Sequence, residues 1–253
     1  MTESSSTWKQ AQKRERHYYE VRAASHDAGE GVYAEFHAPF WTGILDKLTE
    51  LTFKDDGCYV DVGCGPNPIV AFVPCGRRVG IDPLMDFYQE NFTFPDHFEA
   101  HAGMIEDLAP VEDGSADIIF SMNNIDHISD LSAAAKALHK KLKSDGHLVV
   151  SVNVVGNPVM GLLYKLFDIY RIVDPTHTYH FHSPQEVANA LSSGFDLVRY
   201  ESIEHLADEM HSRKNEAQRT TLKGVVRAAL KFVKNHIILR ESLHLFLLRP
   251  KSN

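Results

Sequence analysis

The sequence predicts an α/β fold in which helices cover a mostly parallel sheet. Three observations carry this prediction. Strand-like apolar segments alternate with helical patterns from residue 58 onward. The first such segment breaks directly into the turn Gly63-Cys64-Gly65, and the second ends in Asp82. Glycines after a first strand and an acid after a second are typical of a nucleotide-binding crevice at the carboxyl ends of parallel strands.

Length and composition favour a single domain over residues 1–253. The chain has 253 residues, of which 43% are hydrophobic, enough for one well-buried α/β core. Its net charge of −8 provides no basic field for a phosphate backbone, so a small-molecule acceptor is expected and nucleic acid is not. The three cysteines lack C-x-x-C spacing, which predicts neither disulfides nor a metal site and fits a cytoplasmic protein. No apolar stretch reaches the ~18 residues that span a bilayer, so membrane association is not expected.

The chain begins with a predicted helical cap over residues 1–52. Helical patterns cover residues 8–21 and 32–51, and the second pattern places Phe40 and Ile44 on one apolar face. This face should pack the cap against the sheet.

Residues 55–155 are the predicted ligand-binding core. Strand patterns along the chain occupy residues 58–62, 78–81, 98–102, 116–122, 147–153, 195–203 and 243–248. Helical patterns of the core begin near residues 68, 84 and 131. The first of these helices should be short, because Pro66, Pro68 and Pro74 interrupt it and proline is tolerated chiefly in a first helical turn. Ser144-Asp145-Gly146 predicts a turn before the fifth strand.

Two segments follow this core. Residues 156–182 predict a lid or acceptor-binding loop, and its apolar part, residues 156–173, is interpreted in two ways. It is either a helix buried over the sheet or in a homodimer interface, or a lid over the acceptor pocket, with a lipid-linked acceptor as one option. Residues 183–253 complete the sheet and include a basic helical segment at residues 205–238. That segment is interpreted as a solvated face or as a contact for anionic lipid or a phosphorylated acceptor.

The glycine turn and Asp82 together predict a nucleoside derivative as the ligand. Gly63 and Gly65 can adopt backbone angles closed to other residues and let a ligand approach the backbone. Asp82 follows Gly63 by 19 residues, where a carboxylate can accept hydrogen bonds from both hydroxyls of a ribose. The dinucleotide fingerprint G-x-G-x-x-G has a third glycine, and Pro68 stands there in this chain, which argues against NAD and FAD.

Several segments of the core resemble the class I S-adenosylmethionine-dependent methyltransferases. They are Asp61-Val62-Gly63-Cys64-Gly65, Val79-Gly80-Ile81-Asp82-Pro83-Leu84, Gly103-Met104-Ile105-Glu106-Asp107-Leu108, residues 112–121 and Met122-Asn123-Asn124-Ile125-Asp126-His127. The resemblance implies a Rossmann-like, seven-stranded sheet with an antiparallel last strand, an N-terminal helical cap and a helical insertion after strand five. It also implies S-adenosylmethionine as the cofactor and a small-molecule acceptor, with a fainter similarity to enzymes of saccharide biosynthesis.

The resemblance further implies which residues hold the cofactor. They are Tyr19, Asp61, Gly63, Gly65, Asp82, Pro83, Leu84, Met104, Ile105, Glu106 and Asn123. The family's cap often brings an aromatic hydroxyl to the cofactor, so Tyr18 and Tyr19 are candidates, with core packing as the alternative. Met104 stands where the family commonly has an Asp that accepts a hydrogen bond from adenine. That acceptor is either missing or replaced by Glu106 or Asp107. Met104 could instead lie against the adenine face, and the Ile105 N–H could still donate to a ring nitrogen.

The predicted reaction is methyl transfer to a hydroxyl of a sugar or another small metabolite. An alcohol must lose a proton, and histidine is the commonest side chain for that role. The candidate bases are His127, after the fourth strand, and His177 and His180, in a loop that resembles the family's loop before strand six. Local packing or hydrogen bonding is the alternative for each of these histidines, and His and Asp side chains of residues 174–182 could instead hold a divalent cation. N-methylation, which needs no strong base, and a non-catalytic relative that binds the cofactor are the other functions left open.

Overall fold

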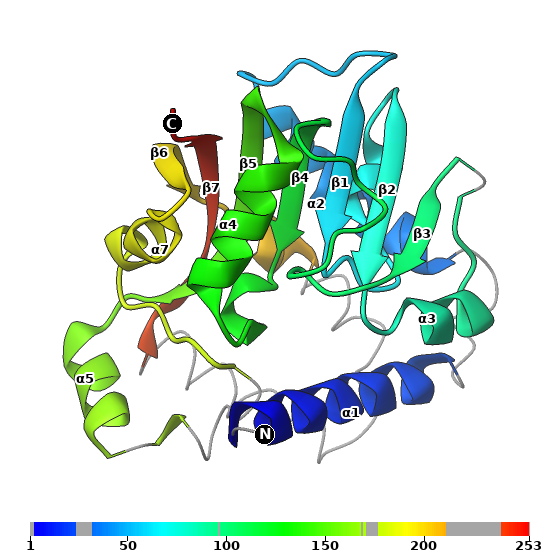
Figure 1. Cartoon of the computed structure of the whole chain (residues 1–253). Helices are drawn as coiled ribbons and strands as arrows, with labels where there is room; N and C mark the ends of the chain where they lie inside the picture. The colour runs from blue at the N-terminus through cyan, green and yellow to red at the C-terminus, as the bar shows by residue number, and fades with distance from the viewer. Residues whose placement is uncertain are drawn as a thin grey trace.

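A computed structural model describes residues 3–23, 32–95, 97–167, 169–170, 177–210 and 239–252. These residues form a seven-stranded sheet with the order β3-β2-β1-β4-β5-β7-β6 (Figure 1). The strands are β1 Cys58–Val62, β2 Arg77–Asp82, β3 Glu99–Ala102, β4 Ala116–Met122, β5 Leu142–Val155, β6 Phe195–Ser202 and β7 Glu241–Pro250. Strands β1 to β5 pair in parallel, whereas β7 is antiparallel to β5 and β6. The predicted Rossmann-like sheet with an antiparallel last strand is confirmed.

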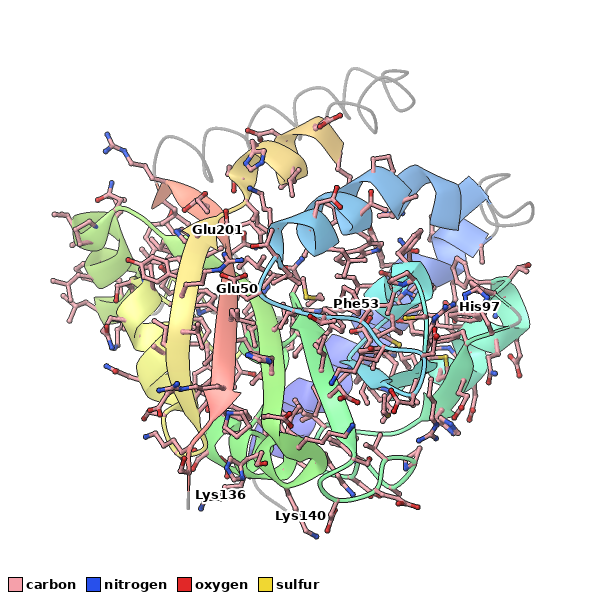
Figure 2. The ribbon with its side chains drawn as sticks, turned by 90° about the horizontal axis from the view of Figure 1, so that it is seen from above. Glu50, Phe53, His97, Lys136, Lys140 and Glu201 are labelled. Carbon is pink, nitrogen blue, oxygen red and sulfur yellow. The ribbon has the colours of Figure 1, made fainter. Side chains whose placement is uncertain are left out.

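Helices surround this sheet, and some of them cover its two faces. The helices are α1 Glu3–Ala23, α2 Val32–Lys47, η1 Ile69–Phe72, α3 Met85–Asn91, η2 Ile125–His127, α4 Leu131–Lys141, α5 Pro158–Leu166 and α7 Pro184–Leu191. Figure 2 separates the layers, with Lys136 and Lys140 of α4 on one side of the sheet and Glu50 and Phe53, which follow α2, on the other. In Figure 1, α1 crosses the edge of the sheet at which the parallel strands end. The cap therefore lies over the edge at which a Rossmann-like sheet binds its ligand.

The sheet has a hydrophobic core on each face. On one face, Leu131, Ala134 and Leu138 of α4 are buried against β-strand side chains such as Val150. On the other face, Ile44 of α2 is buried in a cluster that also contains residues of β1, β4 and η1. Full burial of a leucine or isoleucine stabilises the fold by about 1.5–3 kcal/mol relative to exposure. These contacts hold the strand ends that form the site.

Two predicted features are wrong, namely the start of the first helix and the turn before the fifth strand. The first helix begins at Glu3, earlier than the predicted residue 8. Strand β5 begins at Leu142, so the predicted turn at Ser144-Asp145-Gly146 lies inside the strand. The pairing of β4 with β5 shifts register between Ala116 and Ile118, so these polar residues occupy an irregularity rather than a separate turn.

Helix α5, in the apolar segment after β5, is not buried over the sheet, so that part of the first interpretation is wrong, while burial in a homodimer interface stays a prediction. Within α5 only Gly161 is buried. The exposed fractions of Val159, Leu162 and Leu166 are 66%, 56% and 68%. Figure 1 shows α5 standing away from most of the sheet, and only Met160 and Tyr164 among its described residues pack against the small cluster of Val155, Tyr170 and Leu239. None of the described helices is long and apolar enough to cross a bilayer.

The predicted basic helical segment is described only in part. Residues 204–210 are helical, and the remainder up to residue 238 lies outside the described residues. Its basic side chains Lys223, Arg227, Lys231 and Lys234 belong to that part.

Candidate active site

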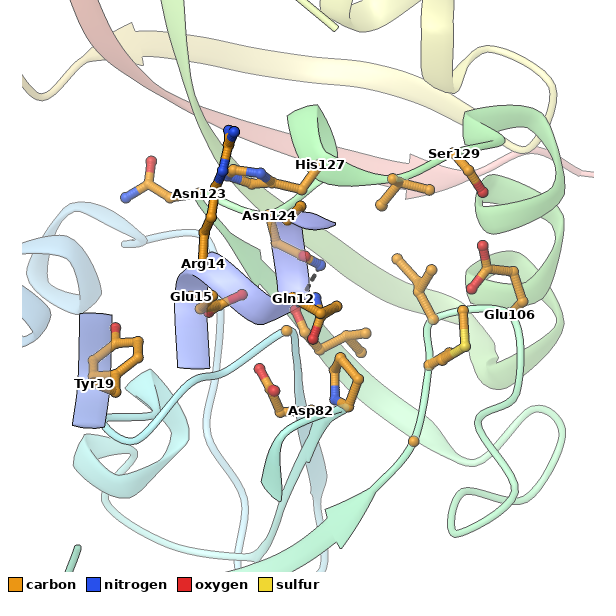
Figure 3. Close-up of a pocket in the computed structure, with 18 of the residues that line it drawn as sticks. Gln12, Arg14, Glu15, Tyr19, Asp82, Glu106, Asn123, Asn124, His127 and Ser129 are labelled. Atoms are coloured by element: carbon orange, nitrogen blue, oxygen red, sulfur yellow. Dashed lines mark hydrogen bonds between the residues drawn. The ribbon is translucent and has the colours of Figure 1, made fainter. Parts of the chain in front are cut away.

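Two adjoining cavities open where β1, β2 and β4 end. The first has a volume of about 440 Å³ (Figure 3), and the second has about 230 Å³. Both are lined by Glu15, Tyr19, Gly63 and Asn123. Together they form a continuous site between the strand ends and α1.

The glycine turn between β1 and η1 forms the floor of this site. Gly63 and Gly65 have φ angles of +69° and +58°, in the left-handed region that favours glycine. The Gly63 N–H donates to the Ile81 carbonyl at 2.8 Å, which ties the turn to β2. A β-carbon on Gly65 would meet only the Tyr19 hydroxyl, at 3.8 Å, so the backbone at Gly65 is open toward the cavity.

Asp82, at the end of β2, holds this turn in place. Its Oδ2 accepts the Gly65 N–H at 3.0 Å and its Oδ1 accepts the Leu84 N–H at 2.8 Å. Burial raises the pKa of Asp82 to about 6, although both hydrogen bonds oppose that shift. Each carboxylate oxygen has two lone pairs, so Asp82 can still accept hydrogen bonds from a ligand.

Asp61, at the end of β1, lies at the second cavity. Its Oδ2 accepts the Ile69 N–H at 2.8 Å and so fixes the start of η1. Its Oδ1 is buried and has no hydrogen-bond partner in the part of the chain that the structure describes. Burial raises the pKa of Asp61 to about 8. An unpartnered carboxylate oxygen at a cavity wall favours a cationic or hydrogen-bond-donating ligand there.

The segment after β3 lines the far side of the first cavity. Gly103, Met104, Ile105 and Glu106 all contribute to the lining. The Gly103 N–H donates to the Asp82 carbonyl at 3.2 Å, which places this segment beside β2. Met104 is 39% exposed, so its thioether can lie against a flat ring.

Asp126, His127 and His177 form a cluster at the edge of the first cavity. Asp126 is buried, and its Oδ2 lies 3.2 Å from His177 Nε2. The His127 and His177 rings lie 4.3 Å apart between centroids. One ligand atom from each residue lies within 4.8 Å of the others, a spacing that could also hold a metal ion.

A backbone clamp brings the two parts of this cluster together. The Asp126 carbonyl accepts the N–H groups of Thr178 and Tyr179 at 2.7 and 3.0 Å. The Tyr179 hydroxyl also donates to the Ser129 carbonyl at 3.3 Å. These bonds join the loop after β4 to the loop before α7, although the two are distant in sequence.

Most of the predicted site residues line the two cavities. Those that do are Tyr19, Asp61, Gly63, Gly65, Asp82, Pro83, Met104, Ile105, Glu106, Asn123 and His127. Leu84 does not, because it precedes α3 and contributes its N–H to Asp82 instead. His177 lies beside His127 but does not line a described cavity, and His180 stacks on Tyr170 with ring centroids 3.8 Å apart.

The contribution of α1 beyond its tyrosines was not predicted. Gln12, Arg14 and Glu15 line the first cavity, and no motif marks them. No role was predicted for Asn124 and Asp126 either, although both lie in the segment that carries the family resemblance. Their position directly after a strand that ends at the site was the available signal.

Comparisons with known proteins agree with this geometry. Residues 60–150 match the family model described as "Methyltransferase domain". No curated protein matches the chain. Phosphoethanolamine N-methyltransferase 2 of Haemonchus contortus, in complex with S-adenosyl-L-methionine, has a similar structure, with a TM-score of 0.62 and 16% identity over 88% of this chain and 57% of that one. The chain thus spans little more than half the length of that protein.

Two further solved structures are similar in fold. Geranyl diphosphate C-methyltransferase from Streptomyces coelicolor A3(2), in complex with Mg²⁺, geranyl diphosphate and S-adenosyl-L-homocysteine, gives a TM-score of 0.61 and 16% identity over 83% of this chain and 79% of that one. A protein described as a sarcosine dimethylglycine methyltransferase from Galdieria sulphuraria gives a TM-score of 0.59 and 14% identity over 87% of this chain and 88% of that one.

The sheet order and the glycine turn with its acid define a Rossmann-like fold, and residues 60–150 of the chain match a methyltransferase domain. The matched domain and the similar folds agree with the predicted class I S-adenosylmethionine-dependent methyltransferase.

Proposed function

We propose that the protein methylates a hydroxyl group of a sugar or another small metabolite. The observation that carries this proposal is the cluster of Asp126, His127 and His177 at the edge of the first cavity. Hydroxyl acceptors need a proton acceptor beside the transferred methyl group, and this cluster supplies one.

The cavities fit S-adenosylmethionine in size and in polar groups. Asp82 would hold the ribose hydroxyls, and Met104 with the Ile105 N–H would hold the adenine. Asp61 and Gly65 would hold the amino-acid end, because both residues line the second cavity and the backbone of Gly65 is open toward it. When bound, S-adenosylmethionine supplies an electrophilic methyl group on a sulfonium.

In this proposal His127 accepts the proton of the acceptor hydroxyl, because it is the histidine of the cluster that lines the cavity. Asp126, 3.2 Å from His177, orients that ring, and His177 packs against His127. A positioned general base contributes about 10²–10⁴-fold to rate. His180 is the weaker candidate, since it lines neither cavity and its ring stacks on Tyr170.

Two other arrangements use the same site. A divalent cation held by Asp126, His127 and His177 would polarise the acceptor hydroxyl instead of removing its proton directly, and the spacing of these groups allows that option. N-methylation of a small metabolite would leave all three residues dispensable, because an amine acceptor can react without a strong base.

The proposal is tested by methyl transfer from labelled S-adenosylmethionine to panels of hydroxyl and amine acceptors. We expect a hydroxyl acceptor, and we expect His127→Ala to lower kcat by about 10²–10⁴-fold while the dissociation constant for S-adenosylhomocysteine is unchanged. His97→Ala, on the surface before β3 (Figure 2), is the matched control. If an amine acceptor is methylated and this activity survives His127→Ala, the proposed reaction becomes N-methylation instead of O-methylation. Activity lost to a chelator and restored by a divalent cation would favour the metal arrangement.

The remaining expectations stay predictions. They are a single methyltransferase domain, a role in saccharide biosynthesis, a cytoplasmic location and a homodimer. The exposed apolar residues of α5 are the surface at which we would look for a second copy.

A further inference from the structure

Glu15 is an acid of the site that neither the sequence motifs nor the proposed chemistry uses. It projects from α1 and lines both cavities. Figure 3 shows it on the cap, in the region between Asp82 and the residues that follow β4. Because it belongs to both cavities, Glu15 stands where the nucleoside part and the amino-acid part of a bound cofactor would meet.

The surroundings of Glu15 place its ionisation near neutral pH. Its Oε1 accepts the Tyr88 hydroxyl at 3.2 Å, and Tyr88 is fully buried on α3. Burial, and next the charge of Asp82, raise the pKa of Glu15 to about 7, while His127 and the Tyr88 hydrogen bond oppose this shift. A small change in nearby charge therefore changes the ionisation state of Glu15.

Three of the titratable groups around Glu15 are carboxyl groups, namely Asp61, Asp82 and Glu106. The groups that line the same cavities or interact with it are Asp61 of β1, Cys64 of the turn, Asp82 of β2, Tyr88 of α3, His127 of η2, Glu106, His37 of α2, and Arg14, Tyr18 and Tyr19 of α1. Burial raises the pKa values of Asp61, Asp82 and Glu15 alike. Arg14, the one arginine in the described lining, is exposed. A cationic ligand would relieve the repulsion among these acids.

The donor and the product of a methyl transfer differ by one charge. S-adenosylmethionine carries a positively charged sulfonium. Because its ammonium and carboxylate charges cancel each other, the donor has a net positive charge, whereas the thioether of S-adenosylhomocysteine is neutral. A carboxylate beside the sulfonium favours the donor over the product, and a neutral carboxylic acid favours neither.

We propose that Glu15 discriminates the cationic methyl donor from the neutral product by ionising when the donor binds and taking up a proton when the product is left. The proton leaves to solvent on donor binding and returns from solvent after transfer, so no other reactant is needed. This inference rests on the proposed place of the cofactor in the two cavities, and it is independent of the acceptor. Since Glu15 is part of α1, the same charge change acts on the helix that covers the site, and it favours release of the product.

The test is calorimetric binding of S-adenosylmethionine and S-adenosylhomocysteine in buffers of different ionisation enthalpy. At pH 7 we expect the wild type to release about half a proton on binding the donor, because the pKa of Glu15 lies near 7, and to release much less on binding the product. We expect Glu15→Gln to lose this release and to lower the preference for donor over product by about tenfold or more. Glu20→Gln is the matched control, because Glu20 is on the same helix but exposed and paired with Arg16.

Three other results would overturn the role proposed for Glu15, and they can be told apart. A Glu15→Gln protein that keeps the donor preference and the proton release would assign the titration to Asp82 instead. Wild-type protein that binds neither ligand would overturn the place of the cofactor, and with it this inference. A further test measures the affinities of the wild-type protein for both ligands as a function of pH. The donor should bind more weakly as the pH falls below 7, whereas the affinity for the product should change little. Equal pH dependence for the two ligands would count against Glu15.

Discussion

The side-chain amide of Asn124 fills the space that a β-carbon on Gly63 would need. Asn124 Nδ2 donates to the Val62 carbonyl at 3.1 Å and to Ser121 Oγ at 3.2 Å, so the amide is held between the ends of β1 and β4. Gly63 has a φ of +69°, which a side chain would strain even without this neighbour. The turn thus requires glycine at position 63 for two independent reasons.

Gly63→Ala should therefore destabilise the protein and abolish cofactor binding. Left-handed strain contributes about 1–2 kcal/mol and the overlap with Asn124 about 1–3 kcal/mol to the loss in free energy of unfolding. Urea denaturation measures the sum. Gly114→Ala separates the backbone strain from the overlap. Gly114 also has a positive φ, +67°, but a β-carbon there would meet nothing within 4 Å, so only the strain lowers the stability of this variant. Equal losses in the two variants would show that Asn124 moves aside at little cost.

Asp82→Ala should weaken the binding of S-adenosylhomocysteine by about 10–150-fold. The substitution removes the hydrogen bonds to the Gly65 and Leu84 N–H groups as well as the acceptor proposed for the ribose. A hydrogen bond to a charged group contributes about 1.5–3 kcal/mol, which is the basis of this range. Calorimetric titration provides the measurement. Asp196→Ala, an exposed position of β6, serves as the control, and unchanged affinity in Asp82→Ala would remove Asp82 from the site.

Asp61→Asn should make the ligand-free protein more stable than the wild type as the pH rises. Burial raises the pKa of native Asp61 to about 8, above its ordinary value of 3.8, so the native state keeps a proton that the unfolded chain has lost. The stability that this proton contributes is complete below about pH 4 and is lost as the pH rises toward 8. Asparagine can still accept the Ile69 N–H and does not ionise.

Thermal or urea unfolding at several pH values measures the difference between Asp61→Asn and wild type. We expect the difference to grow by about 1–4 kcal/mol between pH 5 and pH 8. Comparing the two proteins at each pH cancels the opposite contribution of His147, whose pKa burial lowers. A difference that stays constant over this range would mean that Asp61 is already ionised in the native protein.

The sequence was sufficient to predict the sheet and the turn, but not the cap side of the site. Strand β4 has its predicted bounds, Ala116–Met122, because both faces of a central parallel strand are buried and its apolar run is continuous. Gly63, Gly65 and Asp82 were found because backbone angles and a carboxylate at a fixed spacing restrict residue choice.

Glu15 was not found, because a glutamate in a polar helix has no local signature of burial. Its environment comes from Tyr88 and Asp82, which the fold brings to it from α3 and β2. The pairing of Asp126 with His177 likewise depends on two loops, distant in sequence, that hydrogen bonds of Thr178 and Tyr179 join. Tertiary contacts of this kind have no periodicity that a sequence pattern could reveal.

Leu162→Glu should dissociate a homodimer that forms through α5. The apolar side chains Val159, Leu162, Leu163, Leu166 and Phe167 are all exposed, at positions three or four apart that lie on one helix face. Soluble monomers rarely expose a contiguous patch of this kind. An exposed substitution changes the stability of a monomer by only about 0.5 kcal/mol, so the variant should fold. We expect sedimentation velocity at micromolar concentration to give a dimer for the wild type and for Val198→Glu, an exposed position on β6, and a monomer for Leu162→Glu. A wild-type monomer would contradict the homodimer and leave the lid as the interpretation of α5.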